Sequence, residues 1–572
     1  MADDVRVPEG WKRIKLGEIA EVVSGFGFPV KYQGRDSGDY PFIKVEDLNR
    51  TSKYIISADN YIDKATIDLL KAKIFPSGTI IFPKIGMAVY HNKYRILKVF
   101  ATFDNNIAGV ILTDSSPEFL YYYFLWAVDL KQIAGETAVP SVKKSSLELI
   151  PILLPPLPEQ RKIAEILETI DNAIEKTDKI IEKYKRIKQG LMQDLLTKGI
   201  TAFEFEKNKL VTAVRIAFEC GDHLFGREEN LVSHLSRYLQ EMYPQWDVDS
   251  EVEKNEERQR PDIIIHKRST DKSLFAIEVK KSENLSAIKR DVEKLENLML
   301  EEYHYEDAVF IGFNIENFEE IFDLSDRINF ILVSKDGDIN VKPRIRRFKD
   351  SPLGRMPEEW KVVELGEVSI LKGRIGWHGL TTQEYLEDGE YYLVTGINFK
   401  DGQIDWNSCV YVSKKRYEMD KNIQLKENDV LVTKDGTIGK VAYVGKLPKP
   451  ATLGTGVFVL RPIDDAYYPR YLYYVLTSFI FDKFIEILQA GSTINHLYQR
   501  DFVTFKIPLP PLPEQKRIAS ILSQIDKTIE REQKYKEKLE RIKRGLMEDL
   551  LSGKVRVNHL IEDVKDVEKV EA

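Results

Sequence analysis

The stretch LPPLPEQRKIAEILETIDNAIEK at residues 154–176 occurs a second time as LPPLPEQKRIASILSQIDKTIER at residues 509–531, an offset of 355 residues. The same offset relates KQGLMQDLL, from Lys188, to KRGLMEDLL, from Lys543. A second pair of matching stretches, VPEGWKRIKLGEIAEV from Val7 and MPEEWKVVELGEVSIL from Met356, opens each copy. The chain therefore contains two copies of one unit of about 200 residues, with an unrelated stretch between them.

Composition is that of an ordinary globular protein, with 572 residues of which 43% are hydrophobic and 31% charged. No apolar run reaches the ~18 residues that a membrane span needs, so we expect a cytoplasmic protein without membrane contact. The two cysteines, Cys220 and Cys409, lie far apart and without nearby histidine or cysteine partners. This spacing supports neither a disulfide framework nor a zinc site.

Charge is unevenly distributed along the chain. Residues 203–345 carry 20 Lys and Arg against 31 Asp and Glu, whereas the whole chain has a net charge of −7. The two copies are therefore mildly basic, which is compatible with nucleic-acid contact but is a weak signal by itself.

Each copy divides into a globule and a long helix. Residues 1–157 and 348–512 contain short β-like runs separated by Gly, Asp and Asn turns, which predicts globules of the α/β (α+β) class. Residues 158–199 and 513–553 begin with proline and end with glycine, which favours one long helix in each copy. The charged tail, residues 554–572, is predicted to be disordered.

The two long helices carry a heptad-like apolar stripe. A helix of this length must bury its stripe, and the other copy's helix is the best matched partner. We therefore predict an antiparallel coiled coil with a globule at each end. The alternative is that each helix packs back on its own globule.

The opening PEGW/PEEW and LGE, the PLPPLPEQ helix start and the closing KxGLMxDLL resemble the specificity subunit of type I restriction-modification systems. The resemblance implies two target recognition domains, 1–157 and 348–512, on spacer helices. It implies recognition of an asymmetric bipartite site in double-stranded DNA, because the middles of the two globules differ. It also implies partners: two methyltransferase subunits and, in the restricting complex, restriction/translocase subunits.

Two catalytic motifs are missing from the sequence. There is neither an Asn/Asp-Pro-Pro-aromatic motif of an amino-methyltransferase nor a GxxxxGK(S/T) phosphate loop. S-adenosylmethionine and ATP are therefore expected on the partner subunits and not on this chain.

Candidate DNA-reading residues are short polar or basic side chains in glycine-containing loops, which can enter the major groove. For each residue alone, the alternative is an ordinary solvated turn or helix cap. The candidates are Lys84, Thr137, Ser141 and Lys143 in the first copy, and Lys434, Asp435, Thr437, Lys440, Ser492, Thr493, Asn495, His496, Tyr498 and Gln499 in the second.

The intervening stretch, residues 203–345, resembles the PD-(D/E)xK nuclease fold. It places RPDIIIH before LFAIEVKKS, followed by a helical pattern and the strand-like DAVFIGF. Because side chains alternate along a strand, Glu278 and Lys280 would point to one face. Asp262 and Glu278 are the predicted Mg²⁺ ligands, Lys280 would position or deprotonate the attacking water, and Glu229 would be a further ligand or orienting group.

Three interpretations of the whole chain follow. The first is a type I-like specificity subunit whose insert is a Mg²⁺-dependent endonuclease. In the second, the insert is a degenerate, non-catalytic docking module. In the third, the chain is a self-contained bipartite site-specific nuclease that needs no methyltransferase.

Overall fold

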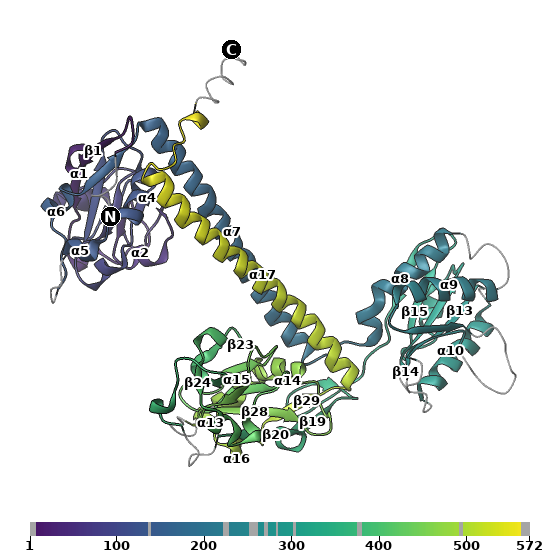
Figure 1. The fold of residues 1–572 in the computed structure, drawn as a ribbon. Helices are drawn as coiled ribbons and strands as arrows, with labels where there is room; N and C mark the ends of the chain where they lie inside the picture. Colours follow the sequence, from purple (N-terminus) through teal and green to yellow (C-terminus); the bar gives the residue numbers. More distant parts are fainter. Residues whose placement is uncertain are drawn as a thin grey trace. The chain divides into compact units, whose positions relative to one another are not determined.

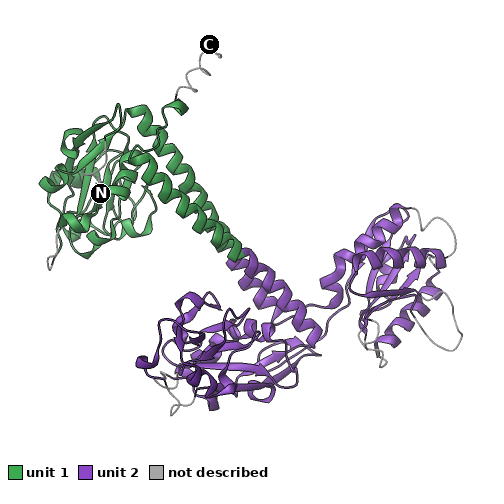
Figure 2. Ribbon diagram, viewed as in Figure 1, with its two compact units in different colours: residues 1–183, 529–572 green, residues 184–528 purple. Residues whose placement is uncertain are grey.

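The computed structural model describes residues 7–134, 139–220, 228–250, 261–267, 273–281, 284–300, 305–374, 380–490 and 496–561 (Figure 1). The chain separates into two compact units. Figure 2 shows the first, Met1–Lys183 with Ile529–Ala572, in green, and the second, Tyr184–Thr528, in purple. Within the described residues, no helix is long and apolar enough to cross a membrane.

The first globule has two small sheets and an aromatic helix. One sheet has the order β2-β9-β6-β7-β4 and the other the order β5-β3-β8. Helix α4 (Pro117–Ala127) is capped by the Ser116 side chain, and buries Phe119 to Phe124 in the core. The strands are β2 (Ala20–Ser24), β3 (Tyr40–Ile43), β4 (Tyr54–Ile55), β5 (Tyr61–Ile62), β6 (Ile80–Pro83), β7 (Arg95–Leu97), β8 (Thr102–Phe103) and β9 (Ile107–Leu112).

The second globule repeats this plan. Its sheets have the orders β20-β28-β25-β26 and β24-β21-β27, and its aromatic helix is α14 (Pro469–Leu476). The α+β composition predicted for both globules matches these elements. The strands of these two sheets are β20 (Ser369–Gly373), β21 (Tyr391–Val394), β24 (Val410–Val412), β25 (Val430–Thr433), β26 (Val441–Tyr443), β27 (Ala451–Leu453) and β28 (Val457–Pro462), and β22 (Phe399–Lys400) pairs separately with β23 (Gln403–Ile404).

Each globule is closed where a strand near its start pairs with its last strand. In the first copy, β1 (Lys12–Lys15) pairs antiparallel with β10 (Pro151–Leu154). In the second, β19 (Lys361–Glu364) pairs with β29 (Lys506–Leu509) in the same way. The last strand leads directly into the long helix, so the direction of the helix is fixed by the globule.

The two long helices are α7 (Leu157–Leu195) and α17 (Leu512–Leu551). Both begin one residue before the proline that was expected to start them. Both are followed by a glycine with positive φ, Gly199 (φ +71°) and Gly553 (φ +72°), which L-residues with a side chain rarely adopt. A Cβ at Gly199 would also lie 2.1 Å from Glu514 Oε1, so the stop is fixed by space as well as by conformation.

The two helices run antiparallel inside each unit. In the first unit, Asp171 and Asp178 of α7 form ion pairs of 2.7 Å with Lys543 and Lys536 of α17. In the second, Lys188 of α7 lies 2.6 Å from Asp526 of α17. As the residue number on α7 rises, the number of its ion-pair partner on α17 falls, which is the register of an antiparallel pair of helices.

The insert is a single six-stranded sheet, ordered β11-β12-β13-β14-β15-β16, with helices on both faces. Helices α8 and α9 share a core with one face, and α10 and α11 with the other. Strands β12, β13 and β14 and helix α10 occupy the positions expected from the sequence. The elements are α8 (Ala202–Glu219), α9 (Glu228–Met242), β11 (Asp247–Ser250), β12 (Ile263–His266), β13 (Ser273–Lys280), α10 (Leu285–Leu300), β14 (Tyr305–Phe313), α11 (Phe318–Phe322), β15 (Asn329–Val333) and β16 (Ile339–Lys342).

Candidate functional site

In the first globule, two of the predicted recognition segments lie side by side. Val142 N–H donates to the Lys84 carbonyl oxygen and Gly86 N–H donates to the Pro140 carbonyl oxygen, both at 2.8 Å, and Ile85 forms a β-bridge with Ser141. Segments more than 50 residues apart in sequence are thus joined at the end of β6. We call residues 84–86 with 140–142 the first paired segments.

The side chains of this site are polar and partly accessible. Ser141 and Lys143 are exposed, while Lys84 is half-buried and donates from Nζ to Ser24 Oγ at 2.8 Å. Partial burial lowers the pKa of Lys84, against the opposing effect of Asp104. The predicted residue Thr137 lies outside the described residues.

The second globule forms the same arrangement at the end of β25. Leu497 N–H donates to the Lys434 carbonyl oxygen at 2.7 Å, and Asp435 forms a β-bridge with His496. The Asp435 carboxylate also contacts His496 Nδ1, and the His496 ring lies 4.6 Å from the Tyr498 ring. We call residues 434–435 with 496–497 the second paired segments.

The remaining predicted residues of the second copy border these segments. Thr437 and Lys440 are exposed in the turn after β25, where Thr433 Oγ1 donates to the Thr437 carbonyl at 2.5 Å and accepts from Lys440 N–H at 2.9 Å. Tyr498 and Gln499 are exposed at the start of a short helix. Ser492, Thr493 and Asn495 lie outside the described residues.

A tryptophan, a glutamate and an arginine fix the start of each long helix, and none of these residues was among those predicted from the sequence. In the first unit, Trp11 Nε1 donates to Glu159 Oε2 at 3.0 Å, and Arg556 donates to both Glu159 oxygens at 2.8 and 2.9 Å. Burial alone would raise the pKa of Glu159, but the hydrogen bonds from Arg556 and Trp11 outweigh it and lower the pKa. The glutamate could have been found from the sequence, because it is the Glu of the PEQ that is repeated at the start of both long helices.

In the second unit, Trp360, Glu514 and Arg346 make the same contacts at 2.8 to 2.9 Å. Ile200 N–H also donates to Glu514 Oε1 at 2.8 Å. Because Ile200 and Arg346 flank the insert, both ends of the insert meet at one carboxylate.

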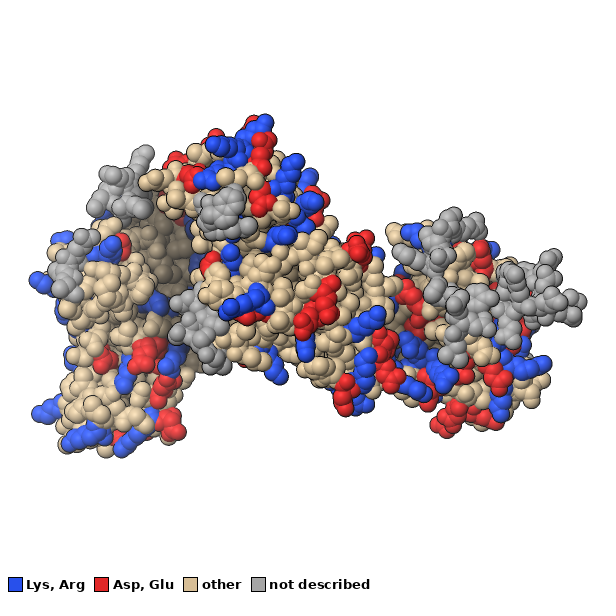
Figure 3. Space-filling model, turned by 90° about the horizontal axis from the view of Figure 1, so that it is seen from below, with Lys and Arg blue, Asp and Glu red and all other residues tan. Residues whose placement is uncertain are grey.

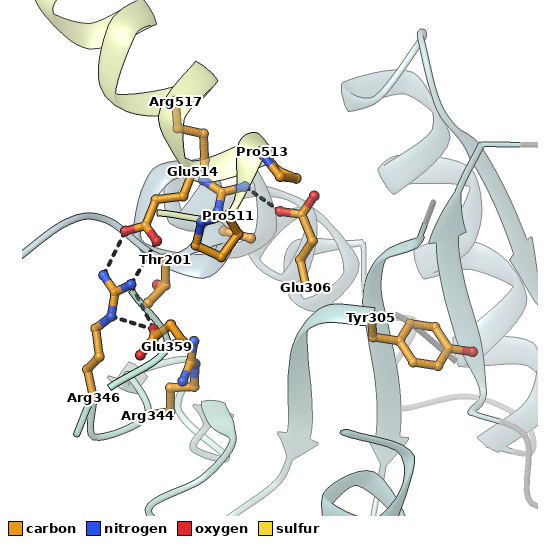
Figure 4. Close-up of a pocket in the computed structure, with 11 residues that line it drawn as sticks. Thr201, Tyr305, Glu306, Arg344, Arg346, Glu359, Pro511, Pro513, Glu514 and Arg517 are labelled. Atoms are coloured by element: carbon orange, nitrogen blue, oxygen red, sulfur yellow. Dashed lines mark hydrogen bonds and ion pairs between the residues drawn. The ribbon is translucent and has the colours of Figure 1, made fainter. Parts of the chain in front are cut away.

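A cavity of about 310 Å³ lies beside this carboxylate. In Figure 4, Arg346 lies between Glu514 and Glu359, and Arg517 of α17 reaches Glu306 of the insert. The third arginine that lines the cavity, Arg344, pairs with the buried Asp307 at 2.7 Å. Each of the three arginines therefore has a carboxylate partner. The cavity therefore belongs to the junction between the insert and the second copy.

In the insert, Asp262 and Glu278 lie opposite one another, because Ile263 pairs with Ile277 in the β12–β13 register. Val279 N–H donates to Asp262 Oδ2 at 2.9 Å. Glu278 is 3% exposed, and Lys294 Nζ of α10 lies 2.6 Å from its Oε1. Burial and the Asp262 carboxylate raise the pKa of Glu278 to about 8, against the opposing effect of Lys294.

Lys280 is on the same side of β13, two residues further along. Its Nζ lies 3.2 Å from Glu228 Oε1 and 3.1 Å from Asp291 Oδ2. The carboxylate that reaches Lys280 from α9 is that of Glu228, one residue before the predicted Glu229, which is exposed. Burial alone would lower the pKa of Lys280, but the two carboxylates outweigh it and raise the pKa.

The donor set of the insert offers two carboxylates to a metal ion. Among the described residues, no three His, Cys, Asp or Glu side chains are grouped to hold a metal. Mg²⁺ keeps several waters and is often bound by only one or two protein carboxylates together with substrate phosphates. Asp262 and Glu278 therefore fit Mg²⁺ as a two-carboxylate site and do not fit an ion that requires a full protein cage.

Acidic and basic side chains are intermixed on the face of the molecule shown in Figure 3. No extended field of one sign is visible on that face.

Comparison with known proteins places the two copies in one family. The profile of the type I restriction modification DNA specificity domain matches residues 8–186 and 357–541, and the insert lies between the matches. The chain is 24% identical over 580 residues to the type I restriction enzyme MjaVIII specificity subunit of Methanocaldococcus jannaschii, covering 97% of this chain and 95% of that protein. It is 27% identical over 209 residues to the EcoKI specificity subunit of Escherichia coli, covering 35% and 44%.

Among solved structures, a type I restriction-modification S subunit from M. genitalium is similar over 96% of both chains, with 13% identity and a TM-score of 0.46. The family profile, in contrast, covers both copies and more than half of the sequence. The chain belongs to the type I restriction modification DNA specificity family.

Proposed function

We propose that this DNA specificity subunit reads an asymmetric bipartite target, with one half-site contacted by each globule. The observation that carries the proposal is that the paired segments form twice on equivalent strands but present different side chains. These side chains are Lys84 and Ser141 in the first copy, and Asp435 and His496 in the second. Unlike donors and acceptors on the same backbone frame would read unlike bases in the major groove.

The test is binding of the full chain to sequences selected from a random DNA pool. Lys84→Ala with Ser141→Ala is expected to weaken recognition of one half-site, and Lys434→Ala with His496→Ala that of the other. Lys12→Ala and Lys446→Ala, which remove exposed lysines elsewhere in the same globules, are the matched controls. Equal effects of all four variants would mean that the paired segments do not read DNA.

The full lengths of α7 and α17 are inferred to form an antiparallel coiled coil. Support comes from the ion pairs of Asp171, Asp178 and Asp526 with the opposite helix. Buried apolar residues that belong to neither globule's core, Ile181 (6% exposed) and Leu539 (6%), provide further support.

Two methyltransferase subunits are proposed as partners of these helices. Ile180 and Ile187 of α7 are 41% and 38% exposed, and the residues 355 positions later, Tyr535 and Ile542 of α17, are 50% and 40% exposed. An apolar stripe repeated at the sequence offset of the duplication suits two copies of one partner. These subunits would carry S-adenosylmethionine, and restriction/translocase subunits would bring ATP chemistry.

This partner proposal is tested by native mass spectrometry of the assembled complex. Tyr535→Lys with Ile542→Lys is expected to lose one methyltransferase subunit and retain the other. Lys538→Glu, a change at an exposed position between them, is the control. Retention of both subunits by the double variant would contradict the proposal.

For the insert we propose a Mg²⁺-dependent endonuclease site. Asp262 and Glu278 would hold the ion, which when bound supplies positive charge to the scissile phosphate and acidifies a water. Lys280, held between Glu228 and Asp291, keeps an ammonium at the mouth of the site, where it can orient an attacking water. Glu278, whose pKa is raised by burial, would give up its proton and its contact with Lys294 Nζ when an ion binds.

Cutting of target DNA with Mg²⁺ is measured with and without methyltransferase subunits, for the wild type, Asp262→Ala and Lys280→Ala. Cutting only by the wild-type complex would support the proposal. Cutting by the isolated chain would favour a self-contained nuclease. If no protein cuts the DNA under any condition, the insert is better explained as a docking module. The ion pairs of Glu514 and Arg517 at the junction with the insert support that alternative.

A further inference from the structure

Where each globule rests on the helices, a tyrosine, an aspartate and a lysine form one group. In the first unit, Tyr122 Oη of α4 donates to Asp171 Oδ2 at 2.7 Å, and Lys543 Nζ lies 2.7 Å from Asp171 Oδ1. Lys543 also lies over the Tyr122 ring, 5.8 Å from its centroid. Each carboxylate oxygen thus has one partner, and the three side chains touch in a closed triangle.

The second unit builds the same group from equivalent residues. Tyr474 Oη of α14 donates to Asp526 Oδ2 at 2.6 Å, and Lys188 Nζ lies 2.6 Å from Asp526 Oδ1. Lys188 lies 5.5 Å from the centroid of the Tyr474 ring. Independent formation of one geometry in both units argues against an incidental surface contact.

These groups are shielded from solvent. Tyr122 and Tyr474 are fully buried as residues, and the side chains of Lys188, Asp526, Lys543 and Asp171 are only 21% to 26% exposed. Hydrogen bonds to a charged group in such a setting are stronger and more directional than exposed ion pairs. These hydrogen bonds can therefore fix the orientation of a globule on the helices in addition to attaching it to them.

The lysine of each group comes from the opposite copy. Asp171 and Asp526 are separated by the duplication offset, and so are Lys188 and Lys543. The first globule rests on its own α7 and is bound by Lys543 of α17, whereas the second rests on its own α17 and is bound by Lys188 of α7. Neither copy alone can complete its group.

We propose that the two Tyr–Asp–Lys groups are positioning elements for DNA recognition, which fix the angle of each globule on the helix pair. The spacing between half-sites would then depend on these groups as well as on helix length, because a globule free to tilt could reach a half-site displaced by a base pair. This proposal rests on the proposed bipartite reading. It assigns no DNA contact to the three residue types.

In each group a second cation donates to the tyrosine, Lys53 to Tyr122 Oη and Arg470 to Tyr474 Oη, both at 3.3 Å, but in the second group this cation also contacts the aspartate. Near Asp171, Lys53 and Tyr54 bind Glu168 one helical turn earlier, at 3.2 and 2.6 Å. Near Asp526, Arg470 reaches the aspartate itself at 3.4 Å and Ser523 at 3.3 Å. The second aspartate therefore has an additional cation, so loss of Lys543 is expected to have a larger effect than loss of Lys188.

The experiment measures binding of the full chain to its selected target and to versions whose spacer is one base pair longer or shorter. Lys543→Met removes the charge and keeps the apolar stem, Lys543→Arg keeps the charge, and Lys538→Met is an exposed control on the same helix. Lys543→Met is expected to weaken binding to the native spacing by about tenfold, with little change for the altered spacings. Lys543→Arg should restore most of the preference.

Two outcomes would overturn the positioning role. One is an unchanged spacing preference in Lys543→Met; the other is an equal loss for all three spacings in parallel with lower thermal stability. Tyr122→Phe, which removes the hydrogen bonds that Tyr122 Oη makes with Asp171 and Lys53 and keeps the packing, separates these outcomes if the lysine variant folds poorly. If the proposed DNA reading itself is wrong, the paired-segment variants will affect neither half-site. That result differs from failure of the positioning role, in which those variants act but Lys543→Met leaves the spacing preference unchanged.

Discussion

At the scale of single residues, the contacts that organise this protein are carboxylates with several partners. Glu159 and Glu514 each bind a tryptophan and an arginine, and Asp171 and Asp526 each bind a tyrosine and a lysine. The sequence repeats both carboxylates in register, but nothing local indicates their partners. Arg556 and Lys543 come from the far end of the chain and contact α7 only because the helices are antiparallel.

Glu278 supplies a pH-dependent prediction. Its pKa is raised from 4.5 to about 8, so the folded state holds a proton that the unfolded state has released between these values. Stability from this group is complete below about pH 4.5 and is lost as pH rises through 8. In chelator, the unfolding free energy of the wild type should fall relative to Glu278→Gln across this window, by up to a few kcal/mol.

The measurement is thermal or denaturant unfolding of both proteins at intervals from pH 5 to pH 9. Mg²⁺ should raise the melting temperature of the wild type at pH 8.5 more than that of Glu278→Gln. Parallel pH curves for the two proteins would show that Glu278 is ionised throughout, as Lys294 alone would favour. A Mg²⁺ effect of equal size in both would contradict the two-carboxylate site.

At the scale of elements, the long helices were the most predictable part of the chain. Their apolar period and their proline and glycine ends placed them within a few residues, although α7 ends at Leu195 and a turn precedes Gly199. The paired segments were predicted as loops, but their pairing with each other depends on tertiary contacts that sequence spacing does not encode. The same limit applies to the insert, where Glu228 and not Glu229 faces Lys280.

Adjacent residues of α7 offer a matched test of the helix pair. Ile181 is 6% exposed and Ile180 is 41% exposed. Ile181→Asp buries an unpaired charge and should lower the unfolding free energy by about 3 kcal/mol or more, whereas Ile180→Asp should change it by less than about 1 kcal/mol. Urea unfolding followed by circular dichroism distinguishes them, and equal effects would argue against packing of the α7 stripe on α17.

At the scale of the whole molecule, the duplication explains how an insert can be accommodated. Gly199 and Gly553 follow the two helices with the same backbone conformation. Arg346 binds the Glu514 carboxylate as Arg556 binds that of Glu159. The insert enters after Ile200 and leaves before Arg346, both of which bind Glu514. The two copies thus keep equivalent junctions despite the additional domain.

Removal of the insert should therefore leave the specificity fold intact. A chain in which residues 202–344 are replaced by a short Gly-Ser linker is expected to fold, to assemble with methyltransferase subunits and to bind the same target. Its Arg346–Glu514 contact should form as in the intact chain. Loss of target binding by a well-folded deletion variant would show that the insert takes part in recognition.

Target selection from random DNA tests whether two globules with unlike paired segments read two unlike half-sites. The wild-type chain should select a motif with two different specified blocks separated by unspecified bases, and Lys434→Ala with His496→Ala should degrade one block only. A single uninterrupted motif, or the same loss in both blocks from changes in one globule, would show that the two globules do not read separate half-sites.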